Sequence, residues 1–546
     1  MTAPPALTPA FAPLFITTAI DYVNAAPHLG HAYEKMATDA LVRYYRLKGH
    51  PVFFLTGTDE HGIKIEKNAK AKGVSPQAFV DDLVPQFQST WALCDVVYDR
   101  FLRTTESAHY AVVAHIWQAL VAAGDLYKAP YQGLYCSGCE AFLTEKDLTP
   151  EGHCLIHQVA PEAVVEENWF FKLSRYKEPL LAQLDVQPDW IFPAFRQQEV
   201  RKLLEEVEDI SVSRSTRSVT WGIPVPNDPS QVIYVWIDAL SNYLTGLGYT
   251  SASDEPFTTF WANATTQAPQ AVHVIGKDIL RFHAVYWPAM LLALKLPLPQ
   301  RIVAHGFITL NEAKISKSLG NVLSAKDVLS HFELPTADAL RYYLLSQTPF
   351  GQDGNFTLDD FKAKVNADLA NNLGNLLNRT LSMLAKYANG VVPTVSEAGD
   401  CPAYQALRDP STWQVALAEA YEGFAFHKAA ELCLSRVDVA NRLINDEAPW
   451  TLFKEAQHER LAALLYSVLE TLRQVAIGLS PLLPHMAPAL LAQLGLPAGL
   501  LHQQTALATL LAQSLPPGLA TAPAGPLLPR LESELAGDAK KAASSV

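Results

Sequence analysis

The sequence predicts an α/β fold in which a doubly wound parallel sheet is split by an insertion and followed by an all-helical bundle. Three observations predict it. Strand-like apolar runs alternate with helical patterns early in the chain, the alternation resumes after a stretch rich in cysteine and glycine, and leucines recur at helical spacing beyond Asn355. A chain of 546 residues is too long for one hydrophobic core, so we expect several domains.

The parallel sheet is predicted in two parts, residues 1–126 and residues 215–330. In the first part, Phe15–Thr18 and Val52–Leu55 are strand-like, and a helical pattern separates them. Parallel strands need such a crossover, so the pattern favours a Rossmann-like domain. The second part contains three further strand-like runs, Val232–Trp236, Val272–Ile275 and Arg301–Gly306.

The bounds of the other predicted domains follow from changes in residue composition and pattern along the chain. Residues 127–214 form the predicted insertion, and residues 331–365 a linking segment, which the family resemblance given below implies is in contact with the stem of the RNA partner. An α-helical domain is predicted over residues 366–515, because leucines there recur every three or four positions, among them Leu369, Leu373, Leu376 and Leu377. The tail, residues 516–546, is rich in Pro, Ala and Gly.

Composition and charge argue against several classes of protein. The net charge is −13, whereas a nucleic-acid partner favours a basic surface, so contact with RNA requires local patches. The apolar run Ala284–Leu294 is too short to span a bilayer. Six cysteines without a disulfide-like framework suit a reducing compartment. We therefore expect a cytoplasmic protein without a membrane segment.

Two short motifs predict a nucleotide site. His28-Leu29-Gly30-His31 follows a strand-like run and opens a helical pattern. Such a turn holds phosphates in α/β sheets, because free backbone N–H groups and the helix dipole point at the anion. Lys314-Ile315-Ser316-Lys317-Ser318, which we call the lysine loop, offers two lysines three positions apart. The residues predicted to bind ATP are His28, Gly30, His31, Lys314, Ser316 and Lys317.

These side chains suit the activation of a carboxylate by ATP. A carboxylate is ionised at neutral pH, so its attack on the α-phosphorus needs no general base, only alignment and stabilisation of charge on the phosphoryl oxygens. His28, His31, Lys314 and Lys317 are therefore predicted to be catalytic. The alternative is an ordinary helix start and a solvated surface loop, which either motif alone leaves open.

A metal site is predicted within the insertion. Cys136-x2-Cys139 is followed by Cys154-x2-His157, and two such turns each offer a pair of ligands. Together they complete a closed tetrahedral set, which is typical of a structural Zn²⁺ ion. The alternative is a set of scattered buried cysteines and a surface histidine.

These motifs, together with several other stretches, resemble the methionyl-tRNA synthetases of class I over about Phe15–Trp450. The other matching stretches are Ala19–Asn24, Thr56–Gly62, Asp209–Arg214, Trp221–Pro224, Tyr234–Leu240, Gly276–Ile279 with His283, and Asn445–Trp450. The resemblance implies that the chain joins L-methionine to tRNA(Met) through methionyl-adenylate, with Mg²⁺ accompanying ATP and one structural Zn²⁺. Ile315 departs from the family, which usually has methionine there.

The resemblance also implies roles for residues that the motifs alone do not single out. Asp59 would hold the ammonium group of the substrate, and Arg214 would act on its carboxylate or on the developing adenylate. Tyr22 or His283 could donate a hydrogen bond to the thioether sulfur. The implied methionine pocket consists of Ile20, Tyr22, Asp59, Trp236, Ala239, Leu240, Tyr243, Ile279 and His283. The implied anticodon contacts are Asn375, Arg379 and Trp450, which could stack on and hydrogen-bond to single-stranded bases.

Three other functions remain open at this point. The chain could be a class I synthetase for valine, isoleucine, leucine or cysteine, although the insertion has little room for the editing domain of the branched-chain enzymes. It could be a non-catalytic RNA-binding module, although the histidines and lysines of both motifs are intact. A nucleotidyltransferase would share the histidine motif but would not need the helical region. We expect a monomer, because the short C-terminal tail leaves no room for a further dimerising domain.

Overall fold

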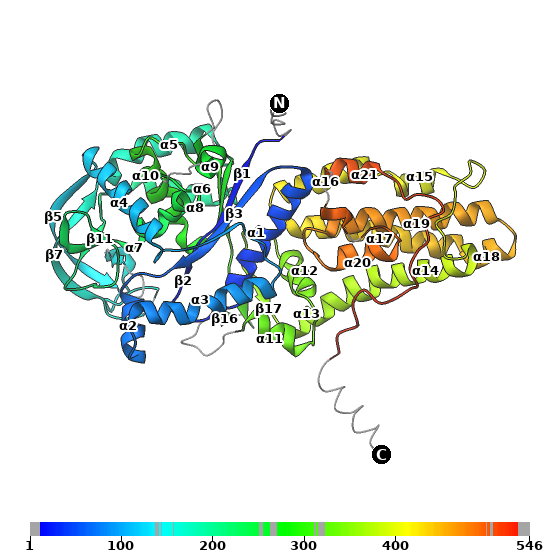
Figure 1. Cartoon of the computed structure of the whole chain (residues 1–546), viewed down its shortest axis with the longest axis horizontal. Helices are drawn as coiled ribbons and strands as arrows, with labels where there is room; N and C mark the ends of the chain where they lie inside the picture. Colours follow the sequence, from blue (N-terminus) through cyan, green and yellow to red (C-terminus); the bar gives the residue numbers. More distant parts are fainter. Residues whose placement is uncertain are drawn as a thin grey trace, which may run out of the picture.

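A seven-stranded parallel sheet forms the centre of the first part of the chain (Figure 1). The computed structural model describes residues 11–136, 141–143, 145–156, 158–250, 255–262, 270–310, 313–314, 323–497, 499–502 and 506–532. Within these residues the strand order is β2-β3-β1-β13-β14-β8, and β4 pairs with the other edge of β3. The strands are β1 (Leu14–Thr18), β2 (Asp21–Tyr22), β3 (Val52–Asp59), β4 (Arg100–Arg103), β8 (Ile191–Phe192), β13 (Ala271–Gly276) and β14 (Arg301–His305).

The two predicted parts of the sheet meet where β1 pairs with β13. Phe15 lies opposite Ala271, and every strand pair in this sheet is parallel. The prediction of a split parallel sheet is therefore confirmed, but Val232–Trp236 is not one of its strands. The strand β12 (Asp228–Ile233) belongs to a separate antiparallel sheet, and the helix α7 (Val235–Leu240) begins two residues later. One strand comes from an unexpected place, because β8 lies inside the predicted insertion yet pairs with β14. Residues 127–214 thus form the insertion and also supply one strand of the central sheet.

Helices cover both faces of the sheet, as alternation along β1 requires. Leu14 and Ile16 point into a core shared with α1 and α3, which continues into the helical region. Phe15 points to the opposite face, into a core shared with α4, α5, α8 and α10. The helices of this part are α1 (Leu29–Lys48), α2 (Ile63–Lys72), α3 (Pro76–Leu93), α4 (Ser107–Ala122), α5 (Lys177–Val186), α6 (Arg196–Glu205), α7 (Val235–Leu240), α8 (Asn242–Gly246), α9 (Glu255–Phe257), α10 (Trp287–Ala293), and the π-helical turns η3 (Thr258–Ala262) and η5 (Phe282–Tyr286).

Two antiparallel sheets are built from the insertion and from the residues that directly follow it. One has the order β6-β5-β7-β9 and the other the order β10-β12-β11. Their strands are β5 (Leu126–Cys136), β6 (Ala141–Leu143), β7 (Glu162–Phe171), β9 (Ile210–Ser211), β10 (Ser213–Ser215), β11 (Pro224–Val225) and β12 (Asp228–Ile233). A further small sheet joins β15 (Ile308–Leu310) to β16 (Ala313–Lys314) and to β17 (Gly354–Phe356).

The helical region confirms the leucine pattern. Its helices are α11 (Ala325–His331), α12 (Asp338–Gln347), α13 (Leu358–Val365), the π-helical η7 (Asn366–Gly374), α14 (Asn375–Ala388), α15 (Pro402–Arg408), α16 (Ser411–Glu422), α17 (Phe426–Glu447), α18 (Pro449–Lys454), α19 (His458–Leu479), α20 (Met486–Gln493) and α21 (Leu507–Ala512). By length and composition α19 could cross a membrane, but most of it is buried inside the bundle. It is therefore the central core helix of this domain.

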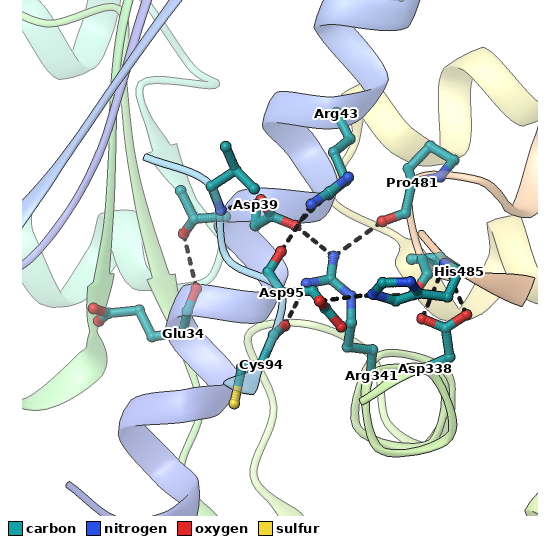
Figure 2. A network of polar contacts seen from close by, with 12 residues as sticks. Glu34, Asp39, Arg43, Cys94, Asp95, Asp338, Arg341, Pro481 and His485 are labelled. Atoms are coloured by element: carbon teal, nitrogen blue, oxygen red, sulfur yellow. Dashed lines mark hydrogen bonds and ion pairs between the residues drawn. The ribbon is translucent and has the colours of Figure 1, made fainter. Parts of the chain in front are cut away.

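A buried arginine joins the helical bundle to the α/β part. Arg341 on α12 is fully buried, and its guanidinium donates to the Asp39 carboxylate of α1 at 2.6 Å. The same guanidinium donates to the carbonyls of Cys94, Pro481 and Leu482 (Figure 2). One side chain therefore ties α1, the end of α3 and the turn between α19 and α20 together.

Candidate active site

A cavity of about 720 Å³ opens where the strands of the parallel sheet end. Its walls include Ala19 just after β1, Asp59 at the end of β3, Gly276 at the end of β13 and His305 at the end of β14. After β1 the chain goes on to β3, which is added on one side of β1. After β13 the chain goes on to β14, which is added on the opposite side of the sheet. Such a switch point at the carboxyl ends of parallel strands is where open α/β sheets bind ligands.

The histidine motif caps the first helix beside this cavity. The Nδ1 atom of His28 accepts a hydrogen bond from the Gly30 N–H at 3.1 Å, and the Nδ1 atom of His31 accepts one from the His28 N–H at 3.1 Å. A ring nitrogen that accepts carries no proton, so both rings are neutral and protonated at Nε2. The cap therefore leaves both imidazoles with Nε2–H donors, and both line the cavity together with Gly30.

Described residues on either side of the lysine loop lie in the cavity wall or contact the histidine motif. Lys314 lies in β16, opposite Thr309 of β15, and β15 begins at Ile308 in the cavity wall. On the far side of the loop, the Leu323 carbonyl accepts a hydrogen bond from the Leu29 N–H at 2.9 Å. Ser316 and Lys317 lie outside the described residues. The backbone contact places Leu323, five residues beyond the lysine loop, beside the histidine motif.

All nine residues implied for the methionine pocket line the cavity: Ile20, Tyr22, Asp59, Trp236, Ala239, Leu240, Tyr243, Ile279 and His283. The ring of Trp236 stacks on that of Phe282, with centroids 3.6 Å apart and planes within 4°. Phe282 also lines the cavity, although no sequence pattern singles it out. A flat aromatic wall of this kind suits an apolar, polarizable thioether.

Tyr243 and His283 form a closed hydrogen-bonded pair. The Nδ1–H of His283 donates to the Ile279 carbonyl at 3.0 Å, and the Tyr243 hydroxyl lies 2.7 Å from Nε2. Burial lowers the pKa of His283 to about 4, so the ring is neutral and has only one proton to give. Nε2 therefore accepts from Tyr243. In this arrangement neither ring nitrogen of His283 has a further N–H for the thioether sulfur, and the role of Tyr22 or His283 as the donor to that sulfur stays a prediction.

Four charged or titratable side chains that the sequence patterns do not single out form a cluster at the cavity, and three of them, Asp21, Glu34 and His305, line it. Lys35 on α1 is fully buried and donates to Asp21 and Glu34 at 2.8 Å each. The other Glu34 oxygen lies 3.0 Å from Nε2 of His305. Burial raises the pKa of Asp21 to about 7 in spite of Lys35, whereas Lys35 and His305 lower the pKa of Glu34 against the effect of its burial. No spacing in the sequence marks this cluster, because its members come from three separate segments.

Arg214 is not brought to the cavity. It is buried in β10, where its guanidinium lies 4.3 Å from the Tyr234 ring centre and donates to the Ser213 carbonyl at 2.7 Å. The resemblance placed it on the substrate carboxylate, and the structure does not bring the two sites together. Backbone carbonyls and an aromatic ring hold the side chain within the insertion instead.

The predicted metal ligands are placed only in part. Cys136 ends β5 and Cys154 forms an isolated β-bridge with Leu148, and both cysteines are 1% exposed. Cys139 and His157 lie outside the described residues. Among the described residues, no group of three or more His, Cys, Asp or Glu side chains could hold a metal ion. The two buried thiols lie in the same insertion, and a thiolate is a preferred ligand of zinc.

The implied anticodon residues lie on the surface of the bundle. Asn375 is exposed at the start of α14, and Arg379 one turn later donates to Oδ1 of Asn445 at 3.0 Å. Trp450 on α18 is 54% exposed, which is unusual for so large an apolar ring. An exposed indole offers a plane on which an unpaired base can stack.

Comparison with known proteins identifies the family. The model for class I tRNA synthetases (M) matches residues 14–154 and 147–381. Methionine–tRNA ligases of Thermosynechococcus vestitus and Clostridium perfringens are each 43% identical to the chain, over 88% of its length and over 89% and 73% of theirs. The solved structure of Mycobacterium tuberculosis methionyl-tRNA synthetase in complex with methionyl-adenylate is 38% identical, with a TM-score of 0.88 over 95% of this chain and 100% of that chain. The chain therefore belongs to the methionine–tRNA ligases, a family of class I aminoacyl-tRNA synthetases.

Proposed function

We propose that the cavity activates L-methionine with ATP and that the chain then transfers the methionyl group to tRNA(Met). One observation carries the proposal: the histidine motif and all nine residues implied for the amino-acid pocket line one cavity at the switch point of the sheet. The apolar and aromatic end of that cavity suits the methionine side chain. The end beside the first turn of α1 suits the phosphates.

The reaction follows from the placement of these groups. The methionine carboxylate attacks the α-phosphorus, a bond forms between carboxylate oxygen and phosphorus, and pyrophosphate leaves with the electron pair of the broken P–O bond. The Nε2–H groups of His28 and His31 donate to phosphoryl oxygens, and the ammonium groups of Lys314 and Lys317 supply positive charge to the same oxygens. Mg²⁺ bound with ATP would neutralise further charge on the triphosphate. Asp59 holds the substrate ammonium group.

Pyrophosphate exchange tests this assignment. His31→Ala removes one Nε2–H donor, and Lys317→Ala removes one ammonium group from the loop. We expect each change to lower methionine-dependent exchange of pyrophosphate into ATP by about a hundredfold, as loss of an oriented donor does in other enzymes. Thermal unfolding of the purified variants provides the control for folding. Wild-type exchange rates in both variants would remove the catalytic role of the two motifs.

The insertion is proposed to hold one structural Zn²⁺ ion through Cys136, Cys139, Cys154 and His157. Three thiolates and one imidazole fill a tetrahedral set, so the ion would stabilise the insertion and leave no open position for substrate. The insertion supplies Leu143, Asp147 and Ile156 to the cavity wall. We expect about one zinc per chain by elemental analysis, and loss of that zinc in Cys154→Ser. A wild-type protein purified without zinc would contradict the assignment.

The helical bundle is proposed to recognise the anticodon of tRNA(Met) through Asn375, Arg379 and Trp450. An exposed indole, an amide and a guanidinium on neighbouring helices suit the stacking and hydrogen bonding of unpaired bases. We further propose that the enzyme acts as a monomer in the cytoplasm. Gel filtration with light scattering tests the oligomeric state, and a mass twice that of the 59.9 kDa chain would overturn it.

A further inference from the structure

Asp238 is a fully buried carboxylate behind the wall of the methionine pocket. It lies on α7, the short helix that presents Trp236 and Ala239 to the cavity, but Asp238 itself does not line the cavity. Each of its oxygens lies 2.7 Å from a histidine nitrogen, Oδ2 from Nδ1 of His61 and Oδ1 from Nε2 of His109. Neither histidine is more than 1% exposed. The three side chains form a buried network that the proposed reaction does not use.

The network joins parts of the chain that build different walls of the pocket. His61 follows β3 and lies two residues after Asp59, which lines the cavity. His109 belongs to α4, and its Nδ1 lies 2.9 Å from Oγ1 of Thr245 on α8, the helix that also carries Tyr243. The helices α4, α7 and α8 share one core against the sheet (Figure 1). Asp238 therefore connects the end of β3 with α4, α7 and α8.

The turn after β3 is fixed from its other side as well. Glu60, between Asp59 and His61, accepts hydrogen bonds from Arg103 at 2.8 Å to each oxygen and from the Thr105 hydroxyl at 2.7 Å. The backbone N–H of Glu60 donates to the Thr104 hydroxyl at 2.9 Å. Glu60 and His61, the two residues that follow Asp59, are thus both held by side chains that do not line the cavity.

We infer that Asp238 is a positioning residue for methionine: it fixes the distance between the Asp59 turn and the Trp236 wall through His61 and His109. The inference rests on the proposed function, since it concerns how the same pocket holds its amino acid. The ammonium group and the side chain of one substrate must reach the two walls at once. A change in their separation therefore weakens methionine binding and leaves the phosphate end of the cavity intact.

A carboxylate is suited to this place because each of its oxygens can accept from one imidazole. An amide offers one acceptor oxygen and one N–H2 group. Asp238→Asn therefore preserves the shape of the side chain but sets an N–H donor against one of the two histidines. The donor that loses its acceptor is buried, so the local structure must shift to relieve it.

The test compares Asp238→Asn with Glu470→Gln in methionine-dependent pyrophosphate exchange. Glu470 is a matched control, because it is a buried carboxylate paired with Arg473 in α19, within the helical bundle. In Asp238→Asn we expect the KM for methionine to rise about tenfold and the KM for ATP to stay within about twofold, as loss of a buried hydrogen bond allows. In Glu470→Gln we expect neither KM to change. Unchanged methionine KM in Asp238→Asn, or equal rises for both substrates, would overturn the inference.

A second variant keeps the test decisive should Asp238→Asn fold poorly. His61→Leu removes the link between Asp238 and the Asp59 turn, together with the 2.9 Å contact between Nε2 of His61 and the Tyr110 hydroxyl, and leaves His109 on Asp238. We expect the same selective rise in the KM for methionine, and no further rise in the double variant, because both changes break one connection. If the rises in the KM for methionine of the two single variants multiplied in the double variant, then Asp238 and His61 would have independent roles. A wild-type protein without methionine-dependent exchange refutes the proposed function itself and the inference with it, whereas wild-type exchange with unselective variants refutes the inference alone.

Discussion

Replacing Arg341 by methionine is predicted to loosen the junction between the α/β part and the helical bundle. Methionine fills a similar volume but donates no hydrogen bonds. The change removes the 2.6 Å ion pair with Asp39 and leaves the carbonyls of Cys94, Pro481 and Leu482 without their guanidinium donor (Figure 2). Because Arg341 is 0% exposed, water does not reach these groups without a local opening.

The size of the effect follows from what remains around Asp39. Removing one partner of a buried ion pair costs about 3–5 kcal/mol. Asp39 keeps a second cation, because Nε of Arg43 donates to the same carboxylate at 2.6 Å, so the lower end of that range applies. For a cooperative unit of 150–250 residues, each kcal/mol lowers the melting temperature by about 2–4 °C, which gives a fall on the order of 6–12 °C.

Differential scanning calorimetry at neutral pH measures this effect, with Arg43→Met as the matched control. Arg43 contacts the same carboxylate, but its side chain is 22% exposed and water can replace it. Its loss should cost about 1 kcal/mol or less. If Arg341→Met melts no lower than Arg43→Met, then the buried guanidinium does not hold the junction together and the reasoning fails.

Three further predictions concern single side chains. Tyr243→Phe leaves Nε2 of His283 without its donor and should raise the KM for methionine in pyrophosphate exchange about tenfold; no change would contradict the pairing. His283 has a folded pKa of about 4 against 6.5 when unfolded, so the unfolded state takes up a proton first as pH falls. The contribution of the neutral His283 ring to the free energy of unfolding is complete above pH 6.5 and is lost as the pH falls from 6.5 toward 4. The melting temperature of His283→Gln should therefore fall less than that of the wild type when the pH is lowered over this range. Trp450→Ala should raise the KM for tRNA in aminoacylation about tenfold, far beyond any effect on exchange, and equal effects on both would count against anticodon stacking.

The parts that sequence could predict are those whose signal is local. The histidine motif directly follows a strand and starts a helix, so its neighbours alone indicate a place at the end of a sheet. The leucine repeat of the bundle is equally local, because helical spacing depends only on which face of one helix is buried. The strand-turn-helix context of the motif and the helical leucine pattern are both confirmed, whereas the cap that His28 and His31 form is known only from the structure.

The parts that sequence could not predict depend on contacts between distant residues. Asp238 lies 177 residues from His61 and 129 from His109, and no pattern relates them. The same holds for β8, whose two residues are too few to show a period and join the central sheet from within the insertion. A strand is recognised in a sequence by alternation of apolar and polar residues over four or more positions. A strand of two residues shows no such alternation.

Arg214 shows a different limit. A resemblance transfers a residue by its position in a motif, but the direction of the side chain depends on the register of the strand that carries it. In this chain Arg214 lies in β10 opposite Val232 and turns toward Tyr234. The position of Arg214 in the sequence matches the family motif, but only the structure shows which groups its side chain contacts.

The central claim is that the cavity lined by the histidine motif and the aromatic pocket activates methionine. Exchange of labelled pyrophosphate into ATP, measured with each of the proteinogenic amino acids in turn, tests it most directly. The account predicts that methionine alone supports rapid exchange. Exchange driven by isoleucine, valine, leucine or cysteine instead, or by no amino acid, would contradict it.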